Sequence, residues 1–170
     1  YPEQLLNHAG IHAPDVPPGG PGEHLPQHFP AKYRAEHSEC AYVTDRAIDY
    51  ANERMQFGKP ISHHQMIQAQ IAEMVVEHEA ARMLVYRAAW LKDNGKPNQF
   101  ETSVAKLQAS EAAVHAANEC MKIFGSYGFS TEYPAERLYR DAKSLQIVEG
   151  TSNVQKLIIA GIASGHVANR

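Results

Sequence analysis

The chain has 170 residues, of which 44% are hydrophobic and 8% aromatic, so it is long enough to form one domain with a buried core. Its 16 basic and 19 acidic residues give a formal net charge of −3, and the basic residues are not clustered. Because nucleic-acid backbones bind clustered positive charge, nucleic acid is excluded as the main partner.

The two cysteines, Cys40 and Cys120, lie far apart in the sequence and form no C-x-x-C or Cys/His motif. We therefore expect small buried thiols in a reduced protein, with neither a disulfide nor a metal site. The first ten residues have neither the basic nor the apolar segment of a signal peptide, and the chain has no run of eighteen apolar residues. These features predict a soluble, intracellular protein without a membrane span.

Residues 1–29 are rich in Pro, Gly and His, which helices and strands tolerate poorly. We expect an irregular arm or linker in this segment. Its histidines have irregular spacing, so we expect solvated side chains and no metal site; they are His8, His12, His24 and His28.

Helical periodicity begins at about residue 30, where Pro and Gly become rare and apolar residues recur at spacings of three and four. Gly58 and Pro60 should end the first helix, and Gly125 should end the third. Pro134 is expected in the first turn of a short fourth helix. The predicted helices cover residues 31–56, residues 62 to the sequence KDNGKPN, 100–124, 135–143 and 151–163.

No strand pattern of any length accompanies these helices. We therefore predict an all-α fold for residues 30–170, an antiparallel up-and-down four-helix bundle with one short extra helix at residues 135–143. Within it, His78 lies on the apolar stripe of the second helix and is expected to be a satisfied core residue. Glu111 lies on the apolar stripe of the third helix, and we expect it to be hydrogen-bonded or partly exposed and not catalytic.

Glu149 directly follows two apolar residues and directly precedes Gly150 and a predicted helix start. Ser152 and Gln155 have the spacing of a capping box, which places Glu149 on the loop just before that helix. Such a glutamate is either a solvated group at the edge of a turn or a carboxylate in a dry pocket, where desolvation tunes it for proton transfer. The local sequence leaves both alternatives open.

Three ordered segments resemble one protein family closely. They read ERMQFGKPISHHQ at residues 53–65, MKIFGSYGFSTEYPAERLYRDAK at residues 121–143, and IVEGTSNVQKLI at residues 147–158. Together they resemble the C-terminal helical domain of acyl-CoA dehydrogenases, flavoenzymes that desaturate acyl-CoA thioesters between the α and β carbons. The resemblance runs from about residue 35 to the end of the chain.

The resemblance implies that Glu149 is the base that removes the α proton of an acyl-CoA while hydride passes to the flavin. A thioester α proton is weakly acidic, so hydrogen bonds must stabilise the developing enolate. The resemblance assigns these bonds to the backbone N–H of Glu149 and a ribityl hydroxyl of the flavin. It further implies that Val148 and Gly150 border the substrate, and Ile147 and Val148 are expected to exclude water.

The resemblance also implies an FAD cofactor. Arg54 matches a pyrophosphate-binding arginine, whose planar fork of donors suits phosphate oxygens. A salt bridge from Arg54 to Glu53 or Asp49 is the alternative. Further cofactor-binding residues implied by the resemblance are Gln56, Phe57, His64, Gln65, Lys122, Gly125, Ser126, Thr151 and Asn153.

One departure concerns the turn after the third helix, where Lys122, Gly125 and Ser126 replace the family's Gln-x-x-Gly-Gly pattern. A lysine at that position is able to meet a phosphate. In the family these motifs reach the FAD of a neighbouring subunit, which implies a homo-oligomer, a dimer or a tetramer, or a complementary chain. An electron-transfer flavoprotein partner, and a cytoplasmic location or the mitochondrial matrix in a eukaryote, follow from the same resemblance.

The family's other domains, which supply much of the pocket, have no counterpart in these 170 residues. The chain is therefore expected to be part of a longer gene product or a subunit completed by another chain. A non-catalytic helical assembly module or partner subunit is the alternative, and an oxidase or monooxygenase is a third reading that suits Glu149 less well.

Overall fold

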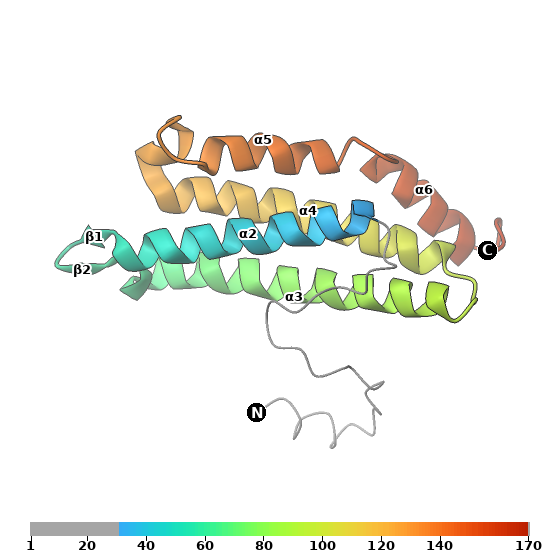
Figure 1. Cartoon of the computed structure of the whole chain (residues 1–170). Helices are drawn as coiled ribbons and strands as arrows, with labels where there is room; N and C mark the ends of the chain where they lie inside the picture. The colour runs from blue at the N-terminus through green and yellow to red at the C-terminus, as the bar shows by residue number, and fades with distance from the viewer. Residues whose placement is uncertain (1–30, 170) are drawn as a thin grey trace, which may run out of the picture.

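The computed structural model describes residues 31–169, with side chains from residue 39 onward. The predicted arm at residues 1–29 lies outside the described residues. The described part is almost entirely helical, which confirms the predicted all-α class (Figure 1). Its helices are α2 (Ala31–Glu53), α3 (Gln65–Asp93), α4 (Gln99–Phe124), α5 (Ala135–Leu145) and α6 (Ser152–Ala163).

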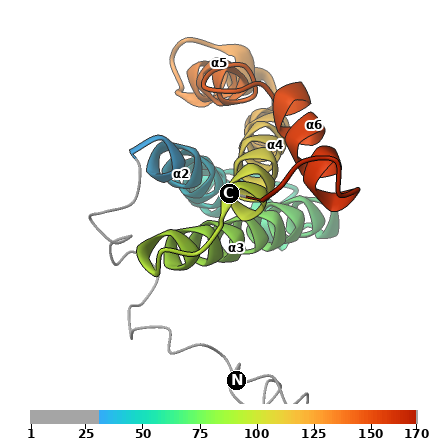
Figure 2. The same cartoon turned by 90° about the vertical axis from the view of Figure 1, so that its right-hand side faces the viewer.

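Helices α2 to α5 run alternately in opposite directions along a common axis (Figure 1). Helix α4 lies at the centre and packs against α2, α3, α5 and α6, as the end-on view shows (Figure 2). Its inner faces are built from small residues, which allow neighbouring helices to approach closely. The buried alanines of α4 are Ala105, Ala109, Ala112, Ala113, Ala116 and Ala117.

The short helix α5 lies lengthwise against α4 and α2 and buries Ala135, Leu138 and Ala142. Helix α6 packs against α4, and Figure 1 shows it at an angle to the bundle. Among the described residues, no helix is long and apolar enough to cross a membrane.

The end of the first helix differs from the prediction. Helix α2 ends at Glu53, not at residue 56, and a two-stranded antiparallel hairpin of β1 (Met55–Gln56) and β2 (Lys59–Pro60) follows. Its two turn residues have positive φ angles, 52° at Phe57 and 78° at Gly58. Two consecutive positive φ angles are typical of a type I′ hairpin turn, which usually carries Asn-Gly. The prediction of no strands was wrong because Phe-Gly lacks that signal.

The cap of the last helix also differs from the prediction. Thr151, not Ser152, is the N-cap, and its hydroxyl accepts a hydrogen bond from Val154 N–H at 3.3 Å. The Gln155 amide donates instead to the Gly150 carbonyl at 3.2 Å. The predicted capping box was therefore wrong, although Glu149 does lie just before the helix as expected.

The remaining boundaries lie within a few residues of those predicted. A 3-10 turn, η1 (Ile61–His63), precedes α3, and a second, η2 (Gly125–Phe129), joins α4 to the loop before α5. Pro134 is the N-cap of α5 and not a first-turn residue. Cys40 and Cys120 are buried free thiols, as predicted, and burial raises the pKa of each to about 12.

Candidate functional site

The predicted site residues fall into two groups that lie at opposite ends of α5 (Figure 1). The first group is on the hairpin and at the end of α4, and the second is on the loop between α5 and α6. Helix α5, whose eleven residues correspond to a length of about 16 Å, lies between them. The structure therefore brings together the residues within each group but not the two groups.

The hairpin turn presents an aromatic side chain to solvent. Phe57 is 90% exposed although its backbone has a φ of 52°, a region that bulky residues rarely occupy. The His64 ring packs edge-on to the Phe57 ring, with 5.8 Å between centroids, and its Nε2 lies 3.2 Å from the Gln56 carbonyl oxygen. Gln65 follows as the exposed first residue of α3. The four predicted residues Gln56, Phe57, His64 and Gln65 thus lie side by side at the hairpin end of the bundle.

Arg54 belongs to the same end of the bundle. Its guanidinium lies 5.7 Å from the centre of the Tyr127 ring in η2, which links the hairpin to the turn after α4. The alternative, a salt bridge from Arg54 to Glu53 or Asp49, is not found among the described residues, and the Asp49 carboxylate pairs with Arg46 at 2.6 Å. Arg54 is exposed, so its donors face solvent.

The turn after α4 begins at Gly125, whose φ of 63° ends the helix. Gly125 and Ser126 are exposed beside this turn, and Lys122 donates to the buried Glu119 carboxylate at 2.5 Å. The Lys122 ammonium is thus already paired within the chain. Sequence analysis did not identify Gly128, where a Cβ would clash with the Met121 backbone. This glycine allows η2 to fold back onto α4.

Glu149 lies on an exposed loop, and its φ of 53° is again in the left-handed region. The apolar residues before it, Ile147 and Val148, are 59% and 47% exposed. Within the described residues, the loop therefore forms the edge of a turn and not a dry pocket. Gly150 has a φ of 98°, so two consecutive left-handed residues turn the chain into α6.

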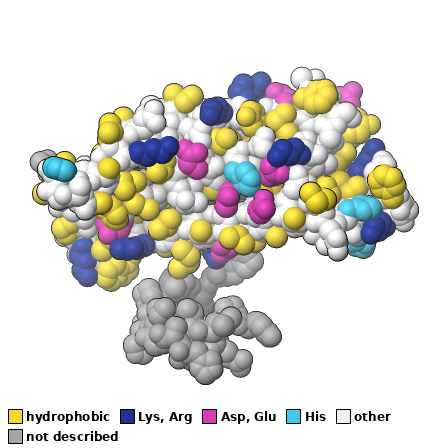
Figure 3. All heavy atoms as spheres, turned by 180° about the vertical axis from the view of Figure 1, so that it is seen from behind, with side chains coloured by type: hydrophobic (Ala, Val, Ile, Leu, Met, Phe, Trp, Pro, Cys, Tyr) yellow, Lys and Arg dark blue, Asp and Glu magenta, His cyan; other side chains and the backbone are white. Residues whose placement is uncertain are grey.

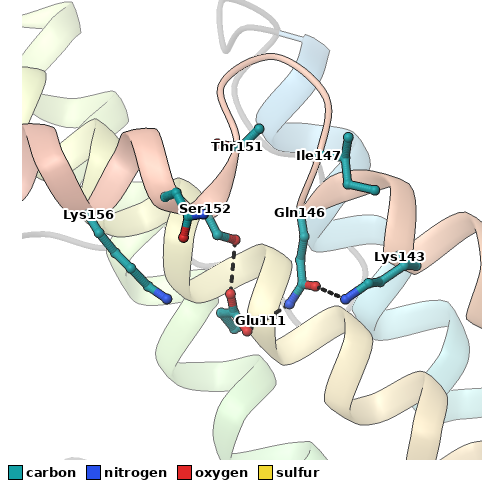
Figure 4. Close-up of a pocket in the computed structure, with 8 residues that line it drawn as sticks. Glu111, Lys143, Gln146, Ile147, Thr151, Ser152 and Lys156 are labelled. Atoms are coloured by element: carbon teal, nitrogen blue, oxygen red, sulfur yellow. Dashed lines mark hydrogen bonds between the residues drawn. The ribbon is translucent and has the colours of Figure 1, made fainter.

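A cavity of about 500 Å³ opens beside this loop (Figure 4). Glu111 of α4 lies at its base and accepts hydrogen bonds from Gln146 Nε2 at 2.7 Å and from Ser152 Oγ at 2.9 Å. Glu111 is hydrogen-bonded and partly exposed, as predicted, but its place beside the loop was not. The cavity is lined by Glu111, Lys143, Gln146, Ile147, Thr151, Ser152, Asn153 and Lys156.

No single charge dominates the far side of the molecule. Figure 3 shows Lys and Arg side chains on that face scattered among hydrophobic and acidic ones. The described residues also contain no group of three metal-binding side chains.

Comparison with known proteins gives one consistent answer. The family described as acyl-CoA dehydrogenase, C-terminal domain, matches residues 35–163. Glutaryl-CoA dehydrogenase of Desulfococcus multivorans is 54% identical over 117 residues, which are 68% of this chain and 30% of that protein. The human mitochondrial short-chain specific acyl-CoA dehydrogenase is 50% identical over 117 residues, 69% of this chain and 28% of that protein.

The fold agrees with these matches. The solved structure of a glutaryl-coenzyme A dehydrogenase with glutaryl-CoA superposes with a TM-score of 0.78 at 48% identity, and the match covers 82% of this chain and 36% of that one. The chain thus spans about a third of the length of its relatives. Because the family match includes every helix from α3 to α6 and most of α2, the chain belongs to the acyl-CoA dehydrogenase family and corresponds to its C-terminal domain.

Proposed function

We propose that this chain supplies the catalytic base of an FAD-dependent acyl-CoA dehydrogenase, and that Glu149 is this base. The observation that carries the proposal is the backbone of Glu149, held at a φ of 53° on a loop directly before the N-terminus of α6. A non-glycine residue in this conformation stores strain, and such strain clusters at active sites, ligand-binding sites and switch regions. The carboxylate of this residue is exposed and so is open to a substrate.

In the proposed reaction, the Glu149 carboxylate takes the α proton of an acyl-CoA thioester and becomes neutral. The α C–H electron pair forms the new double bond as the β hydrogen leaves with its electrons. A bound FAD supplies the acceptor for that hydride. The Glu149 N–H stabilises the thioester oxygen, which gains negative charge as the proton leaves.

The residues of the hairpin end fit one half of an FAD. Arg54 offers an exposed guanidinium for phosphate oxygens, and Phe57 offers an exposed ring face. The turn at Gly125 leaves backbone open to close approach, since a Cβ there would meet nothing within 4 Å. We propose that further contacts to FAD come from two sets of residues. They are Gln56, His64, Gln65, Lys122 and Ser126 at the hairpin end, and Thr151 and Asn153 at the other end of α5.

The position of the two groups at opposite ends of α5 supports a homo-oligomer in which they serve different parts of the cofactor, or different cofactors. Helix α3 supports an assembly independently, because its outward side carries a second apolar stripe opposite the buried one. A helix with apolar residues on both sides is normally covered on both. The exposed stripe consists of Met66, Ala69, Val76, Ala80, Met83 and Trp90.

Assembly would also complete the site around Glu149. Ile147 and Val148 are half exposed here, and we infer that substrate and neighbouring protein cover them, together with Gly150, in the working enzyme. Covering them would remove water from the carboxylate and favour proton transfer. The proposed partners are an acyl-CoA, a second copy of the chain and an electron-transfer flavoprotein, in the cytoplasm or the mitochondrial matrix.

The second candidate is a helical assembly module without catalysis, which the exposed apolar stripe of α3 favours. The test uses the flavin-loaded enzyme that contains this chain and follows bleaching of the flavin absorbance by acyl-CoA. We expect Glu149→Gln to abolish bleaching while FAD stays bound, because an amide cannot take the proton. The matched control is Asp93→Asn, which removes an exposed carboxylate at the end of α3. Unimpaired bleaching in Glu149→Gln would show that another residue is the base.

A further inference from the structure

The loop of residues 147–151, between α5 and α6, requires support from outside itself. It contains two consecutive residues with positive φ, Glu149 at 53° and Gly150 at 98°. A glutamate gains nothing intrinsically from this conformation, so the surrounding structure must hold it there. The contacts that hold the loop therefore also set where the Glu149 carboxylate points.

Two charged side chains of α4 reach the loop from beneath. Lys106 is 2% exposed and its ammonium donates to the carbonyl of Leu145, the last residue of α5. Glu111 lies further along α4 and uses both carboxylate oxygens. Its Oε2 accepts from Gln146 Nε2 at 2.7 Å and its Oε1 accepts from Ser152 Oγ at 2.9 Å (Figure 4).

Glu111 thus binds one residue before the loop and one residue after it. The same two flanks are joined directly, because the Ser152 N–H donates to the Gln146 carbonyl at 3.0 Å. Gln155 adds a bond to the Gly150 carbonyl at 3.2 Å. The two ends of the loop are therefore joined by a backbone hydrogen bond, and the Glu111 carboxylate connects both of them to α4.

The orientation of the Gln146 amide follows from Lys143. The Lys143 ammonium can only donate, and it lies 2.6 Å from Gln146 Oε1. The amide NH₂ of Gln146 must then face Glu111, as Figure 4 shows. A hydrogen bond to a charged acceptor is stronger than one between neutral groups, so a carboxylate suits this position better than an amide or a hydroxyl.

We infer that Glu111 is a positioning residue, a clamp that holds both flanks of the loop so that Glu149 keeps its left-handed backbone. The effect of Glu111 on catalysis rests on the proposed function of Glu149. The effect of Glu111 on the structure of the loop does not depend on that function. Loss of the clamp would leave α4 folded and would let the loop relax toward ordinary backbone angles. The base would then lie out of line with the α proton, and a displacement of about 1 Å is enough to slow a reaction about a hundredfold.

The structural part is tested by hydrogen exchange of the 170-residue chain. We expect Glu111→Ala to speed exchange of the amides in residues 146–152 about tenfold, which corresponds to about 1.4 kcal/mol. In Glu111→Gln the exchange rates should stay within about threefold of those in the parent chain, because the new glutamine amide can accept from Gln146 and donate to Ser152 Oγ. Ser152→Ala removes one of the two bonds and should give an intermediate rate. Unchanged exchange in both Glu111→Ala and Ser152→Ala would overturn the clamp.

The catalytic part is tested in the flavin-loaded enzyme. We expect Glu111→Ala to lower kcat about ten- to a hundredfold with KM and FAD content unchanged, and Glu111→Gln to restore most of it. Asp93→Ala is the control for loss of an exposed carboxylate. A raised KM with an unchanged kcat would contradict positioning. Full bleaching in Glu149→Gln would instead disprove the proposed base, while the exchange measurement would still decide on the clamp.

Discussion

At the scale of single residues, two side chains share an uncommon backbone. Among the described residues, Phe57 and Glu149 are the non-glycine residues with positive φ. Each belongs to a motif that suggested function, and each lies in a different one of the two groups of site residues. Strain in the backbone therefore identifies the same places as the sequence motifs, by an independent route.

The strain at Glu149 can be measured by substitution. We expect Glu149→Gly to be about 1 kcal/mol more stable than Glu149→Ala, because glycine adopts positive φ without a Cβ clash. Urea unfolding of the two variants gives the difference in the free energy of unfolding. Equal stabilities would mean that the left-handed conformation at residue 149 costs nothing in this loop.

At the scale of elements, the hairpin between α2 and α3 carries a residue, Phe57, that lowers the stability of the turn but is proposed to contact the cofactor. Asn-Gly suits a type I′ turn better than Phe-Gly. We expect Phe57→Asn to raise the free energy of unfolding by about 0.5 kcal/mol, since asparagine tolerates positive φ. In the flavin-loaded enzyme the same change should weaken FAD binding, because the exposed ring is lost. Retained FAD affinity would show that Phe57 does not contact the cofactor.

The elements also show how far the sequence alone reaches. Spacings of three and four located every helix, since the buried stripes repeat with the helical period, as Met74, Ala81 and Val85 do on α3. The hairpin was missed because its turn lacks a usual turn pair. The contact between Glu111 and Ser152 could not be predicted, since it joins residues 41 positions apart on different helices. The sequence left open whether Glu149 is exposed or buried, and the structure of the described residues shows it exposed.

At the scale of the whole molecule, stability depends on pH through groups inside the bundle. Burial lowers the pKa of His78, and Glu79 and Asp45 oppose this only in part. The neutral imidazole is thus favoured in the folded state. Burial acts to raise the pKa of Glu119, but hydrogen bonds from Lys122 and Gln70 outweigh it and hold that pKa below its usual value.

Both shifts predict the same acid behaviour. A depressed folded pKa gives stability that is present above the unfolded value, 6.5 for His78 and 4.5 for Glu119, and that is lost as the pH falls. Glu39, whose pKa burial raises, acts in the opposite direction. We expect His78→Gln to flatten the decline in stability between pH 7 and pH 5, measured by urea unfolding. If stability declines equally in the variant and the parent chain, groups other than His78 cause the decline.

The buried thiols set the alkaline limit. Their folded pKa of about 12 lies above the unfolded value of 9.0, so their contribution is complete below pH 9 and is lost as the pH rises toward 12. This range lies well away from the acid transition. The helical bundle is therefore expected to be most stable around neutral pH.

The most direct test of the account isolates proton removal by Glu149 from hydride transfer. A 3-thiaacyl-CoA has sulfur at the β position and cannot give up a β hydride, so only its α hydrogens can react. The measurement is their exchange with deuterium from D₂O, followed by mass spectrometry in the flavin-loaded enzyme. We predict exchange by the parent enzyme and a loss of about a hundredfold or more in Glu149→Gln. Exchange at the parent rate in that variant would contradict the assignment of Glu149 as the base.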